Sequence, residues 1–382
     1  MSESHEATVT ESRWMSVLRT IGVPILSVLL AVGIGSLILL AGGYDPLKAY
    51  AALFQGAFGG PMRKPLDAIG DTLVRSTPLM FTGLAVGFGF RANLFNIGAE
   101  GQFILGSLGA AWFGLLFAGL PTIASIPLIL IGAALFGAAW AFIPALLKAR
   151  TGAHEVITTM MFSWIALYLT SWIISGPLAE SATNNFQTPM LSSAVWLPTL
   201  DKIIPGLPAL KYAHAGLLVA IAAAIVVALL LRRTTLGYEV RAVGFNPTAA
   251  QNGGISIPLT TIWALCISGA LAGMAGASEV LGVTHRMYDQ VSAGAGYGFT
   301  GIAVALLGRK NPAGIIVAAL LFGALSAGSG TMQLFASVPD KIVMIIQALI
   351  IFFVGAETIV SWYVKRRQRL ALERRGAGHA AE

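Results

Sequence analysis

The stretch FRANLFNIGAEGQF, residues 90–103, places polar side chains and two glycines between two long apolar runs. The run before it covers about residues 71–90, and the run after it covers about residues 98–118. Each is close to the roughly twenty residues that a helix needs to cross a bilayer. An ionisable side chain at such a depth usually faces a cavity or a partner inside a helix bundle. The stretch therefore predicts two membrane helices that meet at a polar, functional segment.

Apolar runs of similar length continue along the chain in both directions. Of the 382 residues, 56% are hydrophobic and 11% are charged, whereas roughly a quarter of the residues of a soluble protein are charged. The 44 glycines favour close helix packing within a membrane. We therefore expect an all-α membrane protein with about ten spans, near residues 21–41, 71–90, 98–118, 122–147, 155–175, 213–231, 259–281, 295–308, 312–330 and 339–361.

Lys and Arg residues predict the orientation, because they are retained on the cytoplasmic side of a membrane. They fall on alternate connections, at Arg91, Lys148, Arg150, Arg232, Arg233, Arg241, Arg309, Lys310 and residues 365–369. An even number of spans then places both termini in the cytoplasm of a bacterial cell, under its inner membrane. Residues 1–20 precede the membrane domain of residues 21–361, and the basic tail of residues 362–382 is attracted to anionic lipid.

Three basic residues, Lys48, Arg63 and Lys64, lie on the outer side in this scheme and are exceptions to it. The formal net charge of +7 does not indicate a nucleic-acid partner, because the basic residues border hydrophobic spans. The single cysteine, Cys266, and five histidines without ligand spacing exclude a cysteine metal cluster and predict no metal site.

Two connections are long. The outer one, about residues 176–212, contains five prolines and Trp196, which indicates either an irregular cap with a short surface helix or a plain connector. The inner one, about residues 232–258, is polar and contains a short segment between Pro247 and Pro258. This segment is predicted to be either a docking helix or a flexible connector.

A faint internal repeat is also present. The residues 83–87, GLAVG, resemble the residues 269–273, GALAG, in a span that runs in the opposite direction. Such a similarity between spans of opposite direction is typical of the inverted repeats of transporters, in which the solute path lies between the two halves.

The polar groups of the opening stretch, Asn96, Glu100 and Gln102, are candidates for the lining of a solute path. A structural interpretation is equally open, because Glu100 could pair with Arg91 or stabilise the start of a helix through the helix dipole.

The sequence FNIGAEGQ, followed by a glycine-rich apolar helix, resembles the signature of nucleoside and simple-sugar permease subunits of ABC importers. Residues 237–250, GYEVRAVGFNPTAA, resemble the cytoplasmic loop by which such permeases contact their ATPase, and residues 279–282 and 296–308 are similar as well. The resemblance covers residues 70–355. It implies a type II-like ABC importer permease of the branched-chain amino acid and ribose type.

The resemblance implies three partners: an ABC ATPase subunit, a second and different permease subunit, and an extracytoplasmic substrate-binding protein. The coupling loop would use Glu239, Arg241, Gly244, Asn246, Ala249 and Ala250. The phosphate-binding pattern GxxxxGK[ST] is absent from the chain. We therefore expect no enzymatic activity and no cofactor in this subunit, with ATP and Mg²⁺ bound by the ATPase.

Three further residues complete the candidate path. Tyr297 and Phe299 would stack on a base or sugar ring, or would serve in ordinary packing. Glu279 would accept hydrogen bonds from solute hydroxyls, or would pair with Arg286. The full set of predicted path residues is Asn96, Glu100, Gln102, Glu279, Tyr297 and Phe299.

The function that follows is the import of nucleosides by an ATP-driven complex. Simple sugars such as ribose or galactose are the alternative cargo. An ion-coupled carrier that works alone, with Glu100 as its ion site, and a passive channel are alternatives from other classes.

Overall fold

The computed structural model describes residues 13–180, 186–204, 210, 212–289 and 296–353, and everywhere in these ranges the regular structure is helical. The side chains of residues 13–24 are outside the description, as is the basic tail of residues 362–382. The chain forms two units, one of residues 47–337 and one of residues 1–46 and 338–382. The second unit contributes helix α1 (Arg13–Ala41) and a helix over residues 340–353.

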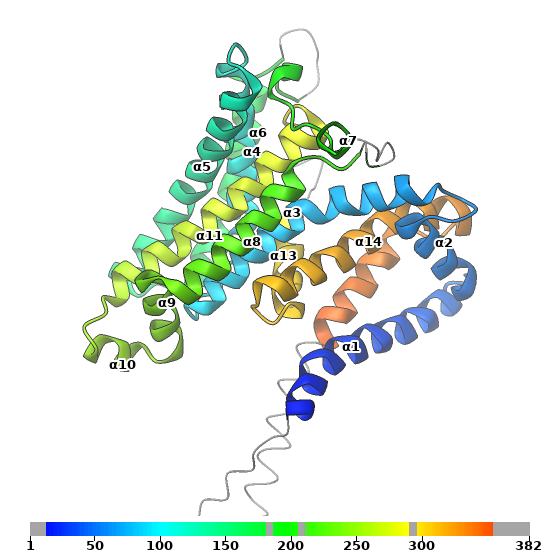
Figure 1. The fold of residues 1–382 in the computed structure, drawn as a ribbon, viewed down its shortest axis with the longest axis horizontal. Helices are drawn as coiled ribbons and strands as arrows, with labels where there is room; N and C mark the ends of the chain where they lie inside the picture. Colours follow the sequence, from blue (N-terminus) through cyan, green and yellow to red (C-terminus); the bar gives the residue numbers. More distant parts are fainter. Residues whose placement is uncertain (1–12, 181–185, 205–209, 211, 290–295, 354–382) are drawn as a thin grey trace, which may run out of the picture. The chain divides into compact units, whose positions relative to one another are not determined.

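The unit of residues 47–337 holds the remaining helices (Figure 1). In chain order they are α2 (Pro46–Phe58), α3 (Pro65–Arg91), α4 (Ala99–Leu116), α5 (Thr122–Thr151), α6 (Glu155–Ser175), η1 (Ser193–Val195), α7 (Leu200–Ile203), α8 (Gly216–Arg233), α9 (Thr235–Phe245), α10 (Pro247–Asn252), α11 (Ile257–Glu279), η3 (Val280–Thr284), α13 (Tyr297–Leu307) and α14 (Pro312–Ala336).

Six helices among the described residues are long and apolar enough to cross a membrane: α3, α5, α6, α8, the continuous run of α11 and η3, and α14. Of the other four expected spans, two are shorter apolar helices, Ile25–Ala41 and Tyr297–Leu307. The third is α4, which begins with the polar residues Glu100 and Gln102. The last is described only over residues 340–353. The chain is thus an all-helical, multi-span protein, and the number ten stays a prediction.

Helix α11 lies at the centre of its unit and packs against α3, α4 and α5. The contact with α5 is close because glycines meet there. A Cβ on Gly137 would collide with the carbonyl oxygen of Gly269, and a Cβ on Gly269 would collide with that of Gly137. Small residues at such a crossing let two backbones pack directly in a membrane, where burial from water does not drive helix association.

Helix α3 is the most deeply buried span, and it contains Pro78. Proline removes a backbone hydrogen bond and bends a helix. Figure 1 shows that α3 changes direction along its length, and α3 packs against both α14 and α8. By contrast, α5 and α6 expose large apolar side chains such as Leu135 and Trp164, as expected of surfaces that face lipid.

Candidate functional site: a half-length helix and an exposed corner

Helix α13 is too short to cross a bilayer. Its 11 residues correspond to about 16 Å, roughly half of the hydrocarbon thickness. Its C-terminal end is tied to the end of α3, because Arg91 Nε donates a 3.0 Å hydrogen bond to the carbonyl of Lys310. The first residues of α13 therefore lie inside the bundle, about half a membrane away from Arg91.

Glu100 caps this interior start of α13. Its two carboxylate oxygens accept hydrogen bonds from the backbone amides of Gly296 (3.1 Å) and Gly298 (2.6 Å). Gly298 has to be glycine because a Cβ there would collide with the Glu100 backbone. A negative charge at a helix N-terminus is favourable, and these amides have no partner within their own helix. Sequence analysis offered two structural roles for Glu100, an ion pair with Arg91 or the capping of a helix start. Glu100 does cap a helix start, but that helix lies nearly two hundred residues further along the chain.

Asn96 and Gln102 form a buried amide pair. Asn96 Nδ2 donates to Gln102 Oε1 (2.8 Å) and to Ser268 Oγ (2.8 Å), and Gln102 Nε2 donates back to Asn96 Oδ1 (3.2 Å). Ser268 Oγ in turn donates to the carbonyl of Ala85 (2.6 Å). These bonds connect α3, α4 and α11 and satisfy polar groups that would be costly if buried alone. In this conformation neither amide is open to a solute.

Glu279 and Tyr297 lie close enough together for their side chains to interact. The ring of Tyr297 also packs on Phe103, with 5.5 Å between the ring centroids. Glu279 does not pair with Arg286, whose Nη1 lies 3.1 Å from Glu180 Oε2. Phe299 is exposed.

Sequence reasoning missed two residues next to this group. Arg75 and Asp71 form an ion pair on α3, with 3.3 Å between Arg75 Nε and Asp71 Oδ1. Oppositely charged residues four apart lie on the same face of a helix, and the pair falls at the edge of an expected span. That spacing was the available signal.

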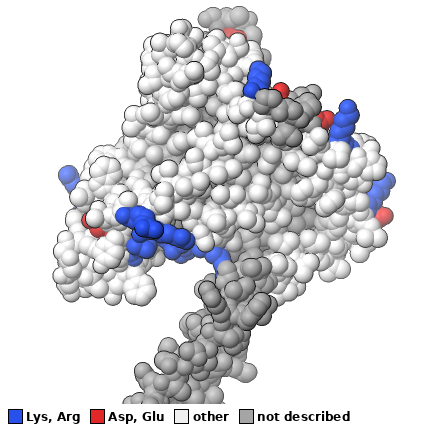
Figure 2. All heavy atoms as spheres, viewed as in Figure 1, with Lys and Arg blue, Asp and Glu red and all other residues white. Residues whose placement is uncertain are grey.

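Basic side chains mark one end of the bundle, which we call the basic end. Arg91, Arg232 and Arg241 lie close enough there to repel one another electrostatically. Figure 2 shows Lys and Arg side chains gathered on this side, where α9 lies in Figure 1.

Helices α9 and α10 form a sharp corner at the basic end. Thr234 and Asn246 start the two helices, because their side-chain oxygens accept hydrogen bonds from the amides of Gly237 (3.0 Å) and Ala249 (3.1 Å). Both are favoured helix-capping residues, and Pro247 suits the first position of α10. The short helix predicted after Pro247 is present, and it ends at Asn252.

Small residues seat the corner on the bundle. Gly244 lies against the carbonyl of Arg91, where a Cβ would collide, and Ala250 is buried. Ala249 and Arg241 are exposed, and Glu239 is half-buried. Phe245, at the tip of the corner, is 95% exposed. Phe245 and the exposed Tyr238 present aromatic side chains outside the bundle, and aromatic residues are enriched at protein interfaces.

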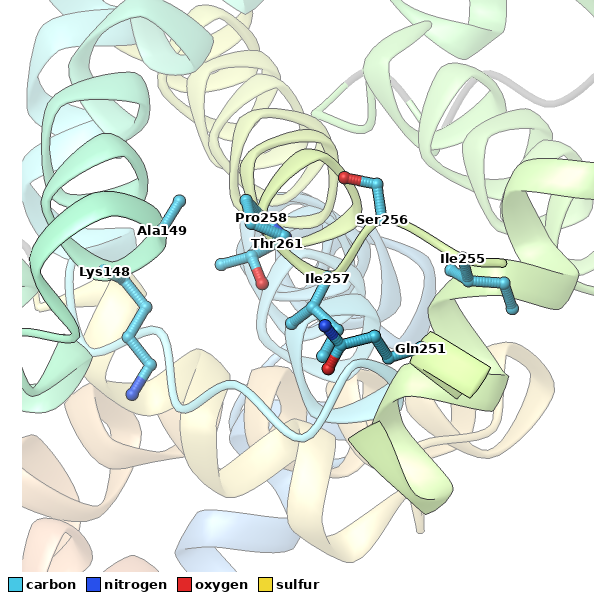
Figure 3. A pocket seen from close by; sticks show the side chains of 8 residues that line it. All are labelled: Lys148, Ala149, Gln251, Ile255, Ser256, Ile257, Pro258 and Thr261. Carbon is cyan, nitrogen blue, oxygen red and sulfur yellow. The ribbon is translucent and has the colours of Figure 1, made fainter. Parts of the chain in front are cut away.

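A cavity of about 420 Å³ opens behind α10. It is lined by the end of α5, the end of α10 and the start of α11, with Lys148, Gln251, Ser256 and Thr261 supplying polar groups (Figure 3). Lys148 Nζ forms a 2.8 Å ion pair with Glu155 Oε2. The cavity lies beside the corner and adds a depression to the same surface.

At the opposite end, the connection between α6 and α8 is fastened to the exit of α11. The amides of Leu191 and Leu197 donate to the carbonyls of His285 (2.9 Å) and Leu281 (3.0 Å). Trp196 stacks on His285, with 3.8 Å between the ring centroids. We call this fastened segment, residues 186–204, the outer cap.

His214 is buried beside the outer cap, and its Nδ1 accepts a 3.2 Å hydrogen bond from the Gly216 amide. Burial lowers the pKa of His214 to about 4, and the neighbouring His285 contributes to the shift. Burial also lowers the pKa of His285. Both imidazoles are therefore neutral at pH 7. No group of three or more metal-ligating side chains occurs among the described residues.

Comparison with known proteins decides the family. A family model described as "Branched-chain amino acid transport system / permease component" matches residues 68–355. The chain belongs to this permease family. The resemblance found in the sequence is thereby confirmed.

The most similar relatives include ABC transporter permeases of different cargo. The chain is 39% identical to a guanosine ABC transporter permease protein of Bacillus subtilis, over 91% of this chain and 96% of the relative. It is 38% identical to a glucose ABC transporter permease protein of Haloferax volcanii, over 93% and 91%. It is 36% identical to a nucleoside ABC transporter permease protein of Lactococcus lactis, over 90% and 92%.

A second protein of Lactococcus lactis, also named a nucleoside ABC transporter permease protein, is 28% identical to this chain, over 67% of this chain and 79% of its own length. No solved structure matches the chain.

Proposed function

We propose that this permease is a membrane subunit of an ATP-driven importer that moves nucleosides into the cell. The observation that carries the proposal is the exposed Phe245 corner at the basic end, in a chain with long similarity to guanosine and nucleoside permeases. The corner would bind an ABC ATPase subunit, which would bring ATP and Mg²⁺. Phe245 and Tyr238, both exposed, lie seven residues apart and therefore on one face of α9.

The other partners follow from the same comparison. Lactococcus lactis has two distinct nucleoside permeases that resemble this chain, which supports a pair of different permease subunits. A substrate-binding protein would dock on the opposite end, at the outer cap. In this orientation the basic end and both termini are cytoplasmic, and the chain passes through the plasma membrane ten times.

A sugar cargo is the alternative, and the similarity to a glucose permease supports it. The glucose permease relative is 38% identical to this chain, against 39% for the guanosine permease relative. Both cargoes are uncharged and rich in hydroxyl groups.

Within the bundle, Glu279 and Tyr297 are the proposed solute contacts. Their side chains meet at the interior start of α13, where a discontinuous helix lies at the level of a solute path. Glu100, Asn96 and Gln102 would contribute by holding the helices that line the path.

The test is uptake into sealed vesicles. The chain is reconstituted with the second permease, the ATPase and the substrate-binding protein, and uptake of radiolabelled guanosine and glucose is measured with ATP or a non-hydrolysable analogue. We expect the complete complex to take up guanosine with ATP but not with the analogue. Vesicles that contain this chain by itself should take up none. Uptake by the lone chain under an ion gradient would show a secondary carrier, and ATP-independent equilibration would show a channel.

A further inference from the structure

Three charged residues, Arg63, Asp71 and Arg75, lie just before α3 or in its first turns. Arg63 and Arg75 both pair with Asp71, at 3.2 Å and 3.3 Å. Arg75 Nη1 also donates a 3.3 Å hydrogen bond to Ser326 Oγ on α14. Asp71 and Ser326 thus fix the position of the Arg75 guanidinium from two helices.

Arg75 also interacts electrostatically with Glu279 and Tyr297, which lie together at the start of α13. Its positive charge lies within electrostatic range of both side chains. Four helices, α3, α11, α13 and α14, therefore contribute polar side chains to one region.

The position of Arg75 within an expected span limits the environment that its side chain can face. Arg75 lies inside the expected span that begins near residue 71, and a charged side chain within a span faces protein or a polar space rather than lipid. Its two partners do not cover it, because 43% of its side chain remains exposed within this chain. The uncovered part of the guanidinium therefore looks into a polar space.

We propose that Arg75 and Glu279 form a contact site for an uncharged, hydroxyl-bearing solute on its way through the membrane. This inference rests on the proposed function. A guanidinium offers several hydrogen-bond donors and a carboxylate offers only acceptors, and the neighbouring hydroxyls of a ribose can both accept and donate. Asp71 holds the donor, Tyr297 lies beside the acceptor, and Glu100 already occupies the helix start that would otherwise attract an anion.

The test compares two cargoes that differ by one hydroxyl. Initial uptake rates of guanosine and 2′-deoxyguanosine are measured with the complete complex in vesicles, for the wild type and for Arg75→Gln. We expect guanosine uptake to fall about tenfold, the effect of losing a hydrogen bond to a charged group. Uptake of 2′-deoxyguanosine should fall much less, so that the ratio of the guanosine rate to the deoxyguanosine rate falls several-fold below its wild-type value.

The ratio isolates this chain, because the substrate-binding protein is the same in both complexes. Arg63→Gln is the matched control: it removes the other guanidinium from Asp71 and should leave the ratio unchanged. If Arg75→Gln fails to assemble, Glu279→Gln gives the same comparison from the acceptor side.

An unchanged ratio overturns the site, whether uptake is kept or lost, because an equal loss of both rates indicates a purely structural role. A wild-type complex that imports neither guanosine nor glucose is a different result. It refutes the proposed function, and this inference falls with it.

Discussion

The interior start of α13 and the corner of α9 and α10 use polar and apolar residues in opposite ways. Inside the bundle, Glu100 and Asn96 are buried and make hydrogen bonds that hold helices in place. At the corner, small residues are buried and Phe245 is presented outward. A polar residue in a membrane span thus need not touch the cargo, and an exposed aromatic residue outside the spans can be the better sign of function.

Removing the Glu100 carboxylate should have the largest effect. Glu100→Ala leaves the amides of Gly296 and Gly298 without an acceptor, at about 1–3 kcal/mol for each buried group. We expect uptake to fall below about a tenth and the purified complex to unfold at a lower temperature. Uptake and thermal unfolding in detergent measure both effects.

Glu100→Gln is the matched variant, because one oxygen remains to accept from Gly298. It should retain much of the stability that Glu100→Ala loses. If Glu100→Ala keeps the wild-type unfolding temperature but stops uptake, Glu100 belongs to the solute path and the contrast between the two regions breaks down.

Truncating Phe245 should weaken binding of the ATPase and leave the stability of this chain unchanged. Phe245→Ala removes an exposed side chain, so the unfolding temperature of the lone chain should stay constant. Loss of an aromatic anchor typically costs about 2 kcal/mol or more of binding, which corresponds to roughly thirtyfold weaker ATPase binding. Co-purification at decreasing concentration measures it.

Phe142→Ala makes the same truncation on the apolar surface of α5, where Phe142 is exposed. ATPase binding should not change in that variant. Equal loss in both variants would mean that Phe245 has no special role.

A bulky residue at position 249 should separate the two sides of α10. Ala249 is exposed and Ala250 is buried. Ala249→Trp should release the ATPase and leave the lone chain stable, whereas Ala250→Trp should destabilise the corner itself, by about 1–3 kcal/mol of overpacking. Gel filtration of the complex and thermal unfolding of the chain distinguish the two. Retained ATPase and normal uptake in Ala249→Trp would remove α10 from the docking surface.

The smallest expected effect is a pH dependence of stability caused by His214, beside the outer cap. The pKa of His214 is lowered to about 4 by burial, against about 6.5 in an unfolded chain. Below pH 6.5 the unfolded chain gains a proton that the folded chain does not, so stability falls between about pH 6.5 and 4. At pH 5.5 the loss is about 1 kcal/mol.

Thermal unfolding at pH 7.5 and 5.5 measures this loss. His214→Gln should reduce it, and His154→Gln should not, because His154 is exposed at the start of α6. An unchanged pH dependence in His214→Gln would show that His214 is not the group that titrates.

The sequence predicts the parts of this fold that depend on near neighbours. Long apolar runs give the helices, and Pro247 marks the start of α10. The expected spans near residues 98–118 and 295–308 correspond to α4 and to the half-length α13.

Contacts between distant residues could not be predicted in the same way. Glu100 meets Gly298 across 198 positions, and Arg75 meets Ser326 across 251. The sequence gives no local signal for either contact. For this reason Glu100 was open to several interpretations, and Arg75 was not identified at all.

The docking corner can be tested most directly by photo-crosslinking. Phe245→benzoylphenylalanine is introduced into the complete complex, with Phe142→benzoylphenylalanine as the control on the apolar surface of α5. After irradiation, the account predicts a covalent product of this chain with the ATPase from position 245 and none from position 142. A complex that imports its cargo with ATP but yields no ATPase product from position 245 would contradict it.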